Sequence, residues 1–132
     1  MTVRKYKEDI DYENLLLLFK SVKDWSWFLE KEIIPRHKKS LQESITYVAL
    51  VNNQIVGYSR SLEDIGSYIY VCELLVAEES RGRALGRTLL ERLVLDYPGH
   101  EVLVMSDEDP YYRKLGYQVE GSIFKVSLRG RG

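Results

Sequence analysis

The spacing of hydrophobic residues in the first third of the chain predicts a strand followed by two helices. Alternation over the first eight residues predicts a short opening strand. Hydrophobic residues then recur three and four positions apart, as on one face of a helix: Leu15, Leu16, Leu18, Phe19 and Val22. Asp9 or Asp11 can cap this helix. A second helix is expected over about Trp25–Ile34, ending at Pro35 because proline breaks a helix interior.

The middle of the chain alternates with the period of β-strands. Ile45–Val51 and Gln54–Arg60 flank the pair Asn52-Asn53. Because asparagine tolerates the positive φ of a tight turn, these two segments are expected to form a hairpin. After the break at Gly66, the segment Tyr68–Val76 is predicted to form another strand.

The last third of the chain predicts a crossover helix between strands. Apolar residues at helical spacing form one face: Leu85, Leu89, Leu90, Leu93 and Val94. This helix is expected to end at Pro98-Gly99, and a short helix is expected between Pro110 and Gly116. Three further strands are predicted, at Glu101–Met105, Tyr117–Glu120 and Ser122–Leu128. This order of elements predicts one domain with a mixed α/β or α+β sheet.

Composition narrows the class of protein. The 132 residues are 45% hydrophobic, which suffices for a core without disulfides or metal ions. Nineteen Lys and Arg against twenty Asp and Glu give a net charge of −1, so the chain lacks the positive charge that binds nucleic acids. The longest apolar runs are far shorter than the ~20 residues that span a bilayer. We therefore expect a cytoplasmic protein without nucleic-acid or membrane partners.

Cysteine and histidine are too sparse for a disulfide or a metal centre. Cys72 is the single cysteine, and His37 and His100 lie far apart without metal-ligand spacing. No metal is expected. Cys72 is expected to be a small buried apolar residue, and His37 to form a solvated basic patch with Lys38 and Lys39.

The strand–loop–helix segment from Leu74 to Leu90 carries the clearest chemistry. The first N–H groups of a helix lack partners and, with the helix dipole, favour an anion. Gly82 and Gly86 allow a ligand to approach the backbone, and three arginines add positive charge: Arg81, Arg83 and Arg87. Neither a Walker loop nor a Gly-x-Gly-x-x-Gly fingerprint is present. The segment predicts a phosphate or pyrophosphate site, with an ordinary solvated loop as the alternative.

Two motifs in this chain resemble those of the GNAT superfamily of N-acetyltransferases. Residues 81–86, Arg-Gly-Arg-Ala-Leu-Gly, resemble the family's Q/R-x-x-G-x-G/A acyl-CoA signature, with Ala84 where the first glycine usually stands. Residues 111–117, Tyr-Tyr-Arg-Lys-Leu-Gly-Tyr, resemble the aromatic-Tyr-x-x-x-Gly-Phe/Tyr motif that follows the family's fifth strand. The intervening helix and strand have the right lengths, so the resemblance covers essentially the whole chain. The short stretch between Met105 and Tyr111 indicates a truncated fourth helix.

The resemblance implies both a fold and an activity. The fold is a single N-acetyltransferase domain over residues 1–132, with a six- to seven-stranded sheet that is mixed, mostly antiparallel, flanked by about four helices and splayed between strands four and five. The activity is transfer of an acetyl group from acetyl-CoA to a primary amine of a small molecule or protein, by direct attack in a ternary complex. Small relatives commonly form homodimers. The alternative is a non-catalytic acyl-CoA-binding module, because fold does not fix function.

The resemblance also implies which residues bind acetyl-CoA. Backbone amides hold its pyrophosphate along Arg81, Gly82, Arg83, Ala84, Leu85, Gly86 and Arg87. Leu75 and Val76 offer backbone groups to the pantetheine arm, in the manner of an added strand. Tyr112 matches the tyrosine that donates a proton to the departing thiolate, although it could instead be a core aromatic.

Glu73 is the candidate base. It is the one carboxylate between Ile65 and Ala77, and strict alternation places it on one face with Ile69, Val71 and Leu75. It would remove the ammonium proton of the acceptor, directly or through a water, with an edge salt bridge as the alternative.

Aromatic residues near the first helices are candidates for the acceptor pocket. Trp25, Trp27 and Phe28 lie beside Asp24 and Glu30, and this combination would suit an amine with apolar bulk. Packing in the core is the more ordinary role for such aromatics.

Overall fold

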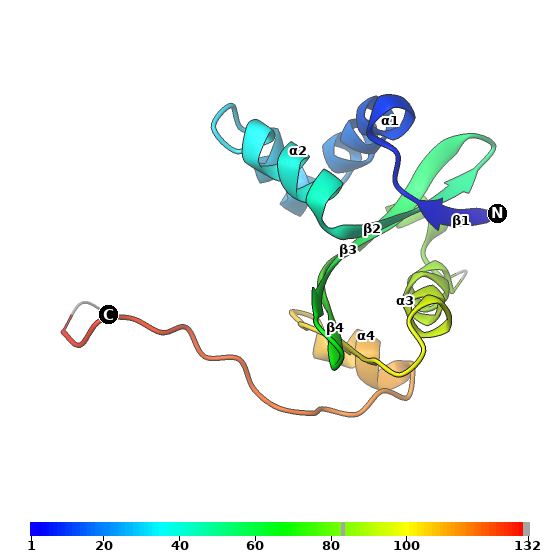
Figure 1. The fold of residues 1–132 in the computed structure, drawn as a ribbon. Helices are drawn as coiled ribbons and strands as arrows, with labels where there is room; N and C mark the ends of the chain where they lie inside the picture. The colour runs from blue at the N-terminus through cyan, green and yellow to red at the C-terminus, as the bar shows by residue number, and fades with distance from the viewer. Residues whose placement is uncertain (83, 131–132) are drawn as a thin grey trace.

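The computed structural model describes residues 1–82 and 84–130 as one sheet with helices on both faces (Figure 1). The strands follow chain order: β1 (Thr2–Lys5), β2 (Ile45–Val51), β3 (Gln54–Asp64), β4 (Tyr68–Val76) and β5 (Glu101–Val104). Neighbouring strands are antiparallel except β4 and β5, which are parallel. The expected mixed, mostly antiparallel sheet is confirmed, with five strands in the described residues instead of six or seven.

Two hydrophobic cores lie on opposite faces of this sheet. On one face are α1 (Glu8–Ser21), the 3₁₀-helix η1 (Lys23–Leu29) and α2 (Ile34–Glu43), whose apolar residues pack on Val48, Tyr58 and Leu75. On the other face, α3 (Leu85–Asp96) packs its leucines on Tyr47, Ile69 and Val71. A single 3₁₀ turn, η2 (Glu78–Ser80), precedes α3, and the short helix α4 (Asp109–Lys114) follows β5.

The boundary between the second and third helical segments differs from the prediction. η1 ends at Leu29 and α2 begins at Ile34, so Pro35 lies in the first turn of α2 instead of ending a helix. Proline fits this position because the first-turn N–H groups have no helical acceptor to lose. The prediction of one helix over Trp25–Ile34 is therefore wrong.

The β2–β3 hairpin has the predicted turn. Asn52 and Asn53 both have positive φ, 51° and 65°, as a tight two-residue turn requires. The helix predicted from the leucine spacing is also confirmed as α3, which ends at Asp96, just before Pro98-Gly99.

The two strands predicted after α4 do not form in this structure. The N–H of Tyr117 donates to the carbonyl of Tyr112 at 3.2 Å, and residues 118–128 make no backbone hydrogen bond to another part of the described chain. This segment extends away from the folded body (Figure 1). A strand forms only where its backbone groups meet a partner edge, so an alternating pattern alone does not create one.

None of the helices in the described parts of the chain combines the length and apolar character needed to cross a lipid bilayer.

Candidate active site

The parallel strands β4 and β5 separate halfway along β4. They pair in register from Tyr68 opposite Glu101 to Val71 opposite Val104. The last hydrogen bond of this pair runs from the N–H of Met105 to the carbonyl of Val71 at 3.2 Å. The second half of β4 therefore has β3 on one side only, and its other edge is open to an extended ligand.

A β-bulge lies at Cys72, just where the two strands separate. Val71 and Glu73 both have partners in β3, whereas Cys72 has none. The extra residue interrupts the alternation of faces. Ile69 and Val71 consequently pack in the core beside α3, whereas Leu75 packs in the opposite core and Glu73 meets α2. The prediction that Glu73 shares a face with Ile69 and Val71 is wrong because of this bulge.

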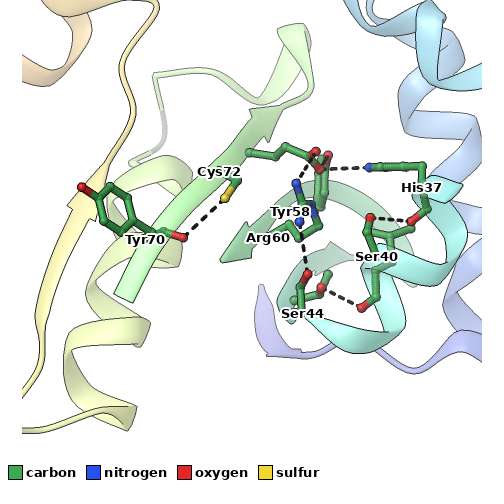
Figure 2. A network of polar contacts seen from close by, with 10 residues as sticks. His37, Ser40, Ser44, Tyr58, Arg60, Tyr70 and Cys72 are labelled. Carbon is green, nitrogen blue, oxygen red and sulfur yellow. Dashed lines mark hydrogen bonds and ion pairs between the residues drawn. The ribbon is translucent and has the colours of Figure 1, made fainter. Parts of the chain in front are cut away.

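The thiol of Cys72 is half-buried and points to the carbonyl of Tyr70, with 3.8 Å between sulfur and oxygen (Figure 2). Burial raises the pKa of this thiol. The thiol thus stays protonated at neutral pH, which disfavours a nucleophilic role.

The carboxylate of Glu73 is the centre of a largely buried polar network. Its Oε1 accepts the hydroxyl of Tyr58 at 2.6 Å and lies 3.0 Å from Nε2 of His37. Its Oε2 accepts the guanidinium of Arg60 at 3.0 Å. Figure 2 shows His37 of α2 converging with Tyr58 and Arg60 of β3. Only 12% of the Glu73 side chain is exposed.

This network fixes the charge of Glu73. Burial alone would raise its pKa, but hydrogen bonds from His37, Arg60 and Tyr58 outweigh burial and lower the pKa to about 2. Glu73 is therefore an anion at neutral pH and, on its own, a weak proton acceptor.

The sequence did not predict the hydrogen-bond partners of Glu73. His37, expected in a solvated patch over residues 37–39, is only 7% exposed, and its ring stacks on Phe28 with 3.9 Å between centroids. One sequence feature could have predicted the burial of His37: Leu41 follows it by one helical turn, so both residues lie on the same face of α2. Nothing local in the sequence pairs Tyr58 and Arg60 with a carboxylate on the next strand.

A cavity of about 140 Å³ opens where β4 and β5 separate. Its lining comes from η1, β4, the segment between β5 and α4, and α4 itself: Trp25, Cys72, Glu73, Leu74, Met105, Asp107 and Tyr112. The structure thus brings the two candidate catalytic residues to one cavity and adds a second carboxylate, Asp107. Trp25 lines this cavity, whereas Trp27 is exposed and Phe28 is buried in the core. A larger cavity of about 380 Å³ lies beside β1 and the end of α2, and no residue of the 81–86 or 111–117 motif lines it.

Tyr112 combines burial with access to the cavity. Its ring packs partly against the core beside α3, and its neighbour Tyr111 lies 5.0 Å away between ring centroids. Burial, assisted by the nearby Tyr111 and Asp107, raises the pKa of Tyr112 to about 12. The Tyr112 hydroxyl therefore stays protonated at neutral pH, and it can donate a hydrogen bond.

The loop before α3 has a backbone suited to an anion. Gly82 and Ala84 have positive φ, 86° and 59°, and no side chain caps α3. Helix geometry leaves the N–H groups of Leu85, Gly86 and Arg87 without acceptors inside the helix. Arg83, the remaining predicted residue of this loop, lies outside the described residues. The described backbone therefore fits the phosphates of a nucleotide-like ligand.

Two arginines of this segment contact backbone carbonyls. Nε of Arg81 donates to the carbonyl of Val76 at 3.1 Å, and the guanidinium of Arg87 donates to the carbonyl of Leu115 at 3.4 Å. The first contact uses one lone pair of the Val76 carbonyl, a β4 group that is expected to hold pantetheine, so a ligand would share this carbonyl with Arg81 or displace it.

Gly86 connects the two sequence motifs in space. A Cβ added at Gly86 would collide with the hydroxyl of Tyr111, whose side chain crosses the first turn of α3. The second motif is thus anchored on the loop of the first, although 25 positions separate Gly86 from Tyr111.

Within residues 1–82 and 84–130, no group of three His, Cys, Asp or Glu side chains is arranged to hold a metal ion.

Comparisons with known proteins agree with this architecture. The sequence model of the family described as "Acetyltransferase (GNAT) domain" matches residues 42–119. No curated protein matches the chain.

Several solved structures share the fold. A GNAT-family acetyltransferase from Streptococcus pneumoniae superposes with a TM-score of 0.69 at 17% identity, covering 97% of this chain and 96% of the other. An aminoglycoside acetyltransferase from an uncultured soil metagenomic sample gives 0.70 at 20% identity, with 96% and 97% covered. A protein described as a transcriptional regulator from Bacillus halodurans gives 0.70 at 16% identity, with 96% and 99% covered.

Proposed function

Because the chain belongs to the GNAT family of acetyltransferases, we propose that it transfers an acetyl group from acetyl-CoA to a primary amine bound in the cavity between β4 and β5. One observation supports this most directly: the fixed anion of Glu73 and the protonated hydroxyl of Tyr112 line the same cavity. The uncapped N-terminus of α3 follows the same strand, β4.

The coenzyme would lie along β4 and the loop that follows it. The N–H groups of Leu85, Gly86 and Arg87 would bind its diphosphate, together with the backbone of residues 81–84. Of the two residues predicted for pantetheine, Val76 turns its backbone groups to the open edge, because Ala77 donates to Val56 of β3 and backbone groups alternate along a strand. Val76 would pair with an amide group of the pantetheine arm, whereas Leu75 pairs with Tyr58 of β3. Acetyl-CoA supplies a thioester, which is the activated acyl group for the transfer.

The acceptor would be a cation when it arrives. Glu73 and Asp107 give the cavity wall negative charge, and Trp25 offers an apolar ring surface beside them. Because the pKa of Glu73 is about 2, this carboxylate would orient the ammonium group and a water molecule, and the water would carry the proton to solvent. The neutral amine can then form the new N–C bond as the C–S bond breaks.

Tyr112 would assist departure of the sulfur. Its hydroxyl would donate a proton to the thiolate as the C–S bond breaks, and solvent would return that proton afterwards. A thiol has an ordinary pKa of about 8.5, so a tyrosine at about 12 donates fully only to a thiolate that is itself desolvated. The partly buried wall of the cavity would exclude water from the thiolate and so desolvate it.

The test compares Tyr112→Phe with Tyr68→Phe, a matched change at the start of β4 outside the cavity. Acetyl-CoA affinity would be measured by calorimetry, and turnover by release of the CoA thiol over a panel of amines. Tyr112→Phe should keep its affinity and lose about 10²-fold or more in kcat, whereas Tyr68→Phe should change neither. An unchanged kcat would remove Tyr112 from the reaction, and no binding at tens of micromolar acetyl-CoA would contradict the proposal as a whole.

The second candidate is a non-catalytic acyl-CoA-binding module. The three hydrogen bonds that fix Glu73 favour it, because they leave the cavity without a strong base. Such a module would bind acetyl-CoA but release no thiol with any amine of the panel.

A further inference from the structure

The cavity between β4 and β5 is lined by two carboxylates, and the first of them, Glu73, has little capacity left to accept a proton. Its oxygens already make three hydrogen bonds, to His37, Tyr58 and Arg60, at 2.6 to 3.0 Å. A carboxylate has about four lone-pair positions, so about one remains for a ligand. A proton on Glu73 would also remove the charge that balances the buried guanidinium of Arg60. Glu73 is thus suited to orienting a cation or a water molecule and poorly suited to taking a proton.

Asp107, the second carboxylate of the cavity, has the opposite properties. It lies in the segment between β5 and α4 and lines the cavity together with Glu73 and Tyr112. The residue is exposed, and within residues 1–82 and 84–130 its carboxylate accepts no hydrogen bond and forms no ion pair. Both of its oxygens can therefore accept a hydrogen bond from a ligand. Its exposure also lets a proton that it has taken up leave to solvent.

A hydrogen-bonded turn fixes the backbone on both sides of Asp107. The hydroxyl of Ser106 accepts the N–H of Glu108 at 3.1 Å and donates to the carboxylate of Asp109 at 2.7 Å. Of the three consecutive acidic residues 107–109, Asp107 is the one that lines the cavity. The turn therefore selects one carboxylate for the cavity and directs its neighbours elsewhere.

The charge of Asp107 also reaches the proposed proton donor. Burial, followed by the nearby Tyr111 and Asp107, raises the pKa of Tyr112. When Asp107 is protonated, its negative charge no longer opposes ionisation of Tyr112, so the phenol becomes a stronger acid. Uptake of a proton by Asp107 would therefore prepare Tyr112 to give one up.

We propose that Asp107 is the general base of the reaction and that Glu73 orients the acceptor without taking its proton. This assignment rests on the acetyltransferase function proposed above. Asp107 takes one proton from the ammonium group, which frees the electron pair of the nitrogen. That pair forms the N–C bond, and the electron pair of the C–S bond leaves with the sulfur, which Tyr112 protonates. The second proton of the nitrogen and the proton on Asp107 pass to solvent, and solvent returns one proton to Tyr112.

The experiment compares the full chain with Asp107→Asn, with the conservative variant Asp107→Glu, and with the matched control Glu108→Gln, which removes the adjacent carboxylate outside the cavity. Acetyl-CoA affinity would be measured by calorimetry. Release of the CoA thiol would give kcat and KM from about pH 5 to 9, using the amine of the panel that the wild type turns over fastest. The titratable groups that share the cavity with Asp107 are Glu73, Cys72 and Tyr112, and all of them are retained in each variant.

We expect Asp107→Asn to keep its affinity for acetyl-CoA and to lose about 10²- to 10⁴-fold in kcat. Its kcat should continue to rise with pH where that of the wild type is level, because hydroxide from solvent must then take the proton. Asp107→Glu should recover part of the loss, and Glu108→Gln should behave as the wild type. Because Asp107 is exposed, its substitution should not unfold the domain, and the unchanged acetyl-CoA affinity checks this.

Three outcomes would overturn the assignment while leaving the acetyltransferase function intact. If Asp107→Asn raised KM but left kcat unchanged, Asp107 would only attract the cationic acceptor. If its kcat fell but kept the pH dependence of the wild type, another group would be the base. If Glu108→Gln lost as much activity, the effect would be one of general charge. A wild type that binds acetyl-CoA but releases no thiol with any amine would instead contradict the acetyltransferase function, and the assignment with it.

Discussion

Replacing Glu73 with glutamine removes the negative charge at the centre of the buried network and leaves the guanidinium of Arg60 without its anion. Lowering the pKa of Glu73 from its ordinary 4.5 to about 2 corresponds to about 3 kcal/mol of folding free energy at neutral pH. Breaking a buried ion pair by removing one partner costs about 3–5 kcal/mol. We therefore expect Glu73→Gln to lower the free energy of unfolding at pH 7 by about 3 kcal/mol.

The same charge predicts the direction of a pH dependence. A carboxyl whose pKa is lower in the folded state stabilises the fold above its unfolded pKa of 4.5, and this contribution disappears as the pH falls toward about 2. The wild type should lose about 3 kcal/mol from this group across that interval. Glu73→Gln has no carboxyl to protonate there, so its stability should fall less steeply with acid.

Urea unfolding followed by tryptophan fluorescence measures both effects, since Trp25 and Trp27 lie in η1 beside the network. Glu91→Gln, an exposed carboxylate on α3, is the matched control and should change the unfolding free energy by less than about 0.5 kcal/mol. Adding Arg60→Met to Glu73→Gln should recover part of the loss, because the buried cation is then gone. If Glu73→Gln showed the same acid dependence as the wild type, the assignment of the lowered pKa would be refuted.

Two further changes test the loop before α3. Ala84 has a φ of 59°, a left-handed conformation that costs a residue with a side chain about 1–2 kcal/mol, so Ala84→Gly should raise the thermal transition; no rise would show that the loop carries no strain. Gly86→Ala places a methyl group against the hydroxyl of Tyr111 and should destabilise the chain by about 1–3 kcal/mol, as other overpacked sites do. Combining it with Tyr111→Phe should recover part of that loss in the same thermal measurement, and an unchanged transition in Gly86→Ala alone would contradict the contact.

The sequence pattern correctly predicted elements whose formation depends on residues close together in the chain. The Asn52-Asn53 turn formed because both residues tolerate positive φ, and α3 formed along its row of leucines. The resemblance also predicted the sheet type and the separation of β4 from β5. For the turn and for α3, the residues that specify the feature are neighbours in sequence or one helical turn apart.

The features that the sequence did not predict depend on partners elsewhere in the chain. The bulge at Cys72 arises from the register of β4 against β3, and a shift of one residue reverses every side chain that follows. Glu73 consequently meets α2, where His37 is buried. The tail has strand periodicity, but it pairs with no strand of the described fold.

The short chain between β5 and α4 explains why half of β4 stays open. Beyond Met105, the hydroxyl of Ser106 accepts the N–H of Glu108 at 3.1 Å and donates to the carboxylate of Asp109 at 2.7 Å. This turn directs the backbone into α4 instead of letting β5 continue beside β4. In α4, Tyr111 contacts the first turn of α3 at Gly86, and the next residue, Tyr112, lines the cavity. Because the two tyrosines are consecutive in α4, a shift of the α3 loop that displaces the α4 backbone through Tyr111 would also displace Tyr112, the proposed proton donor.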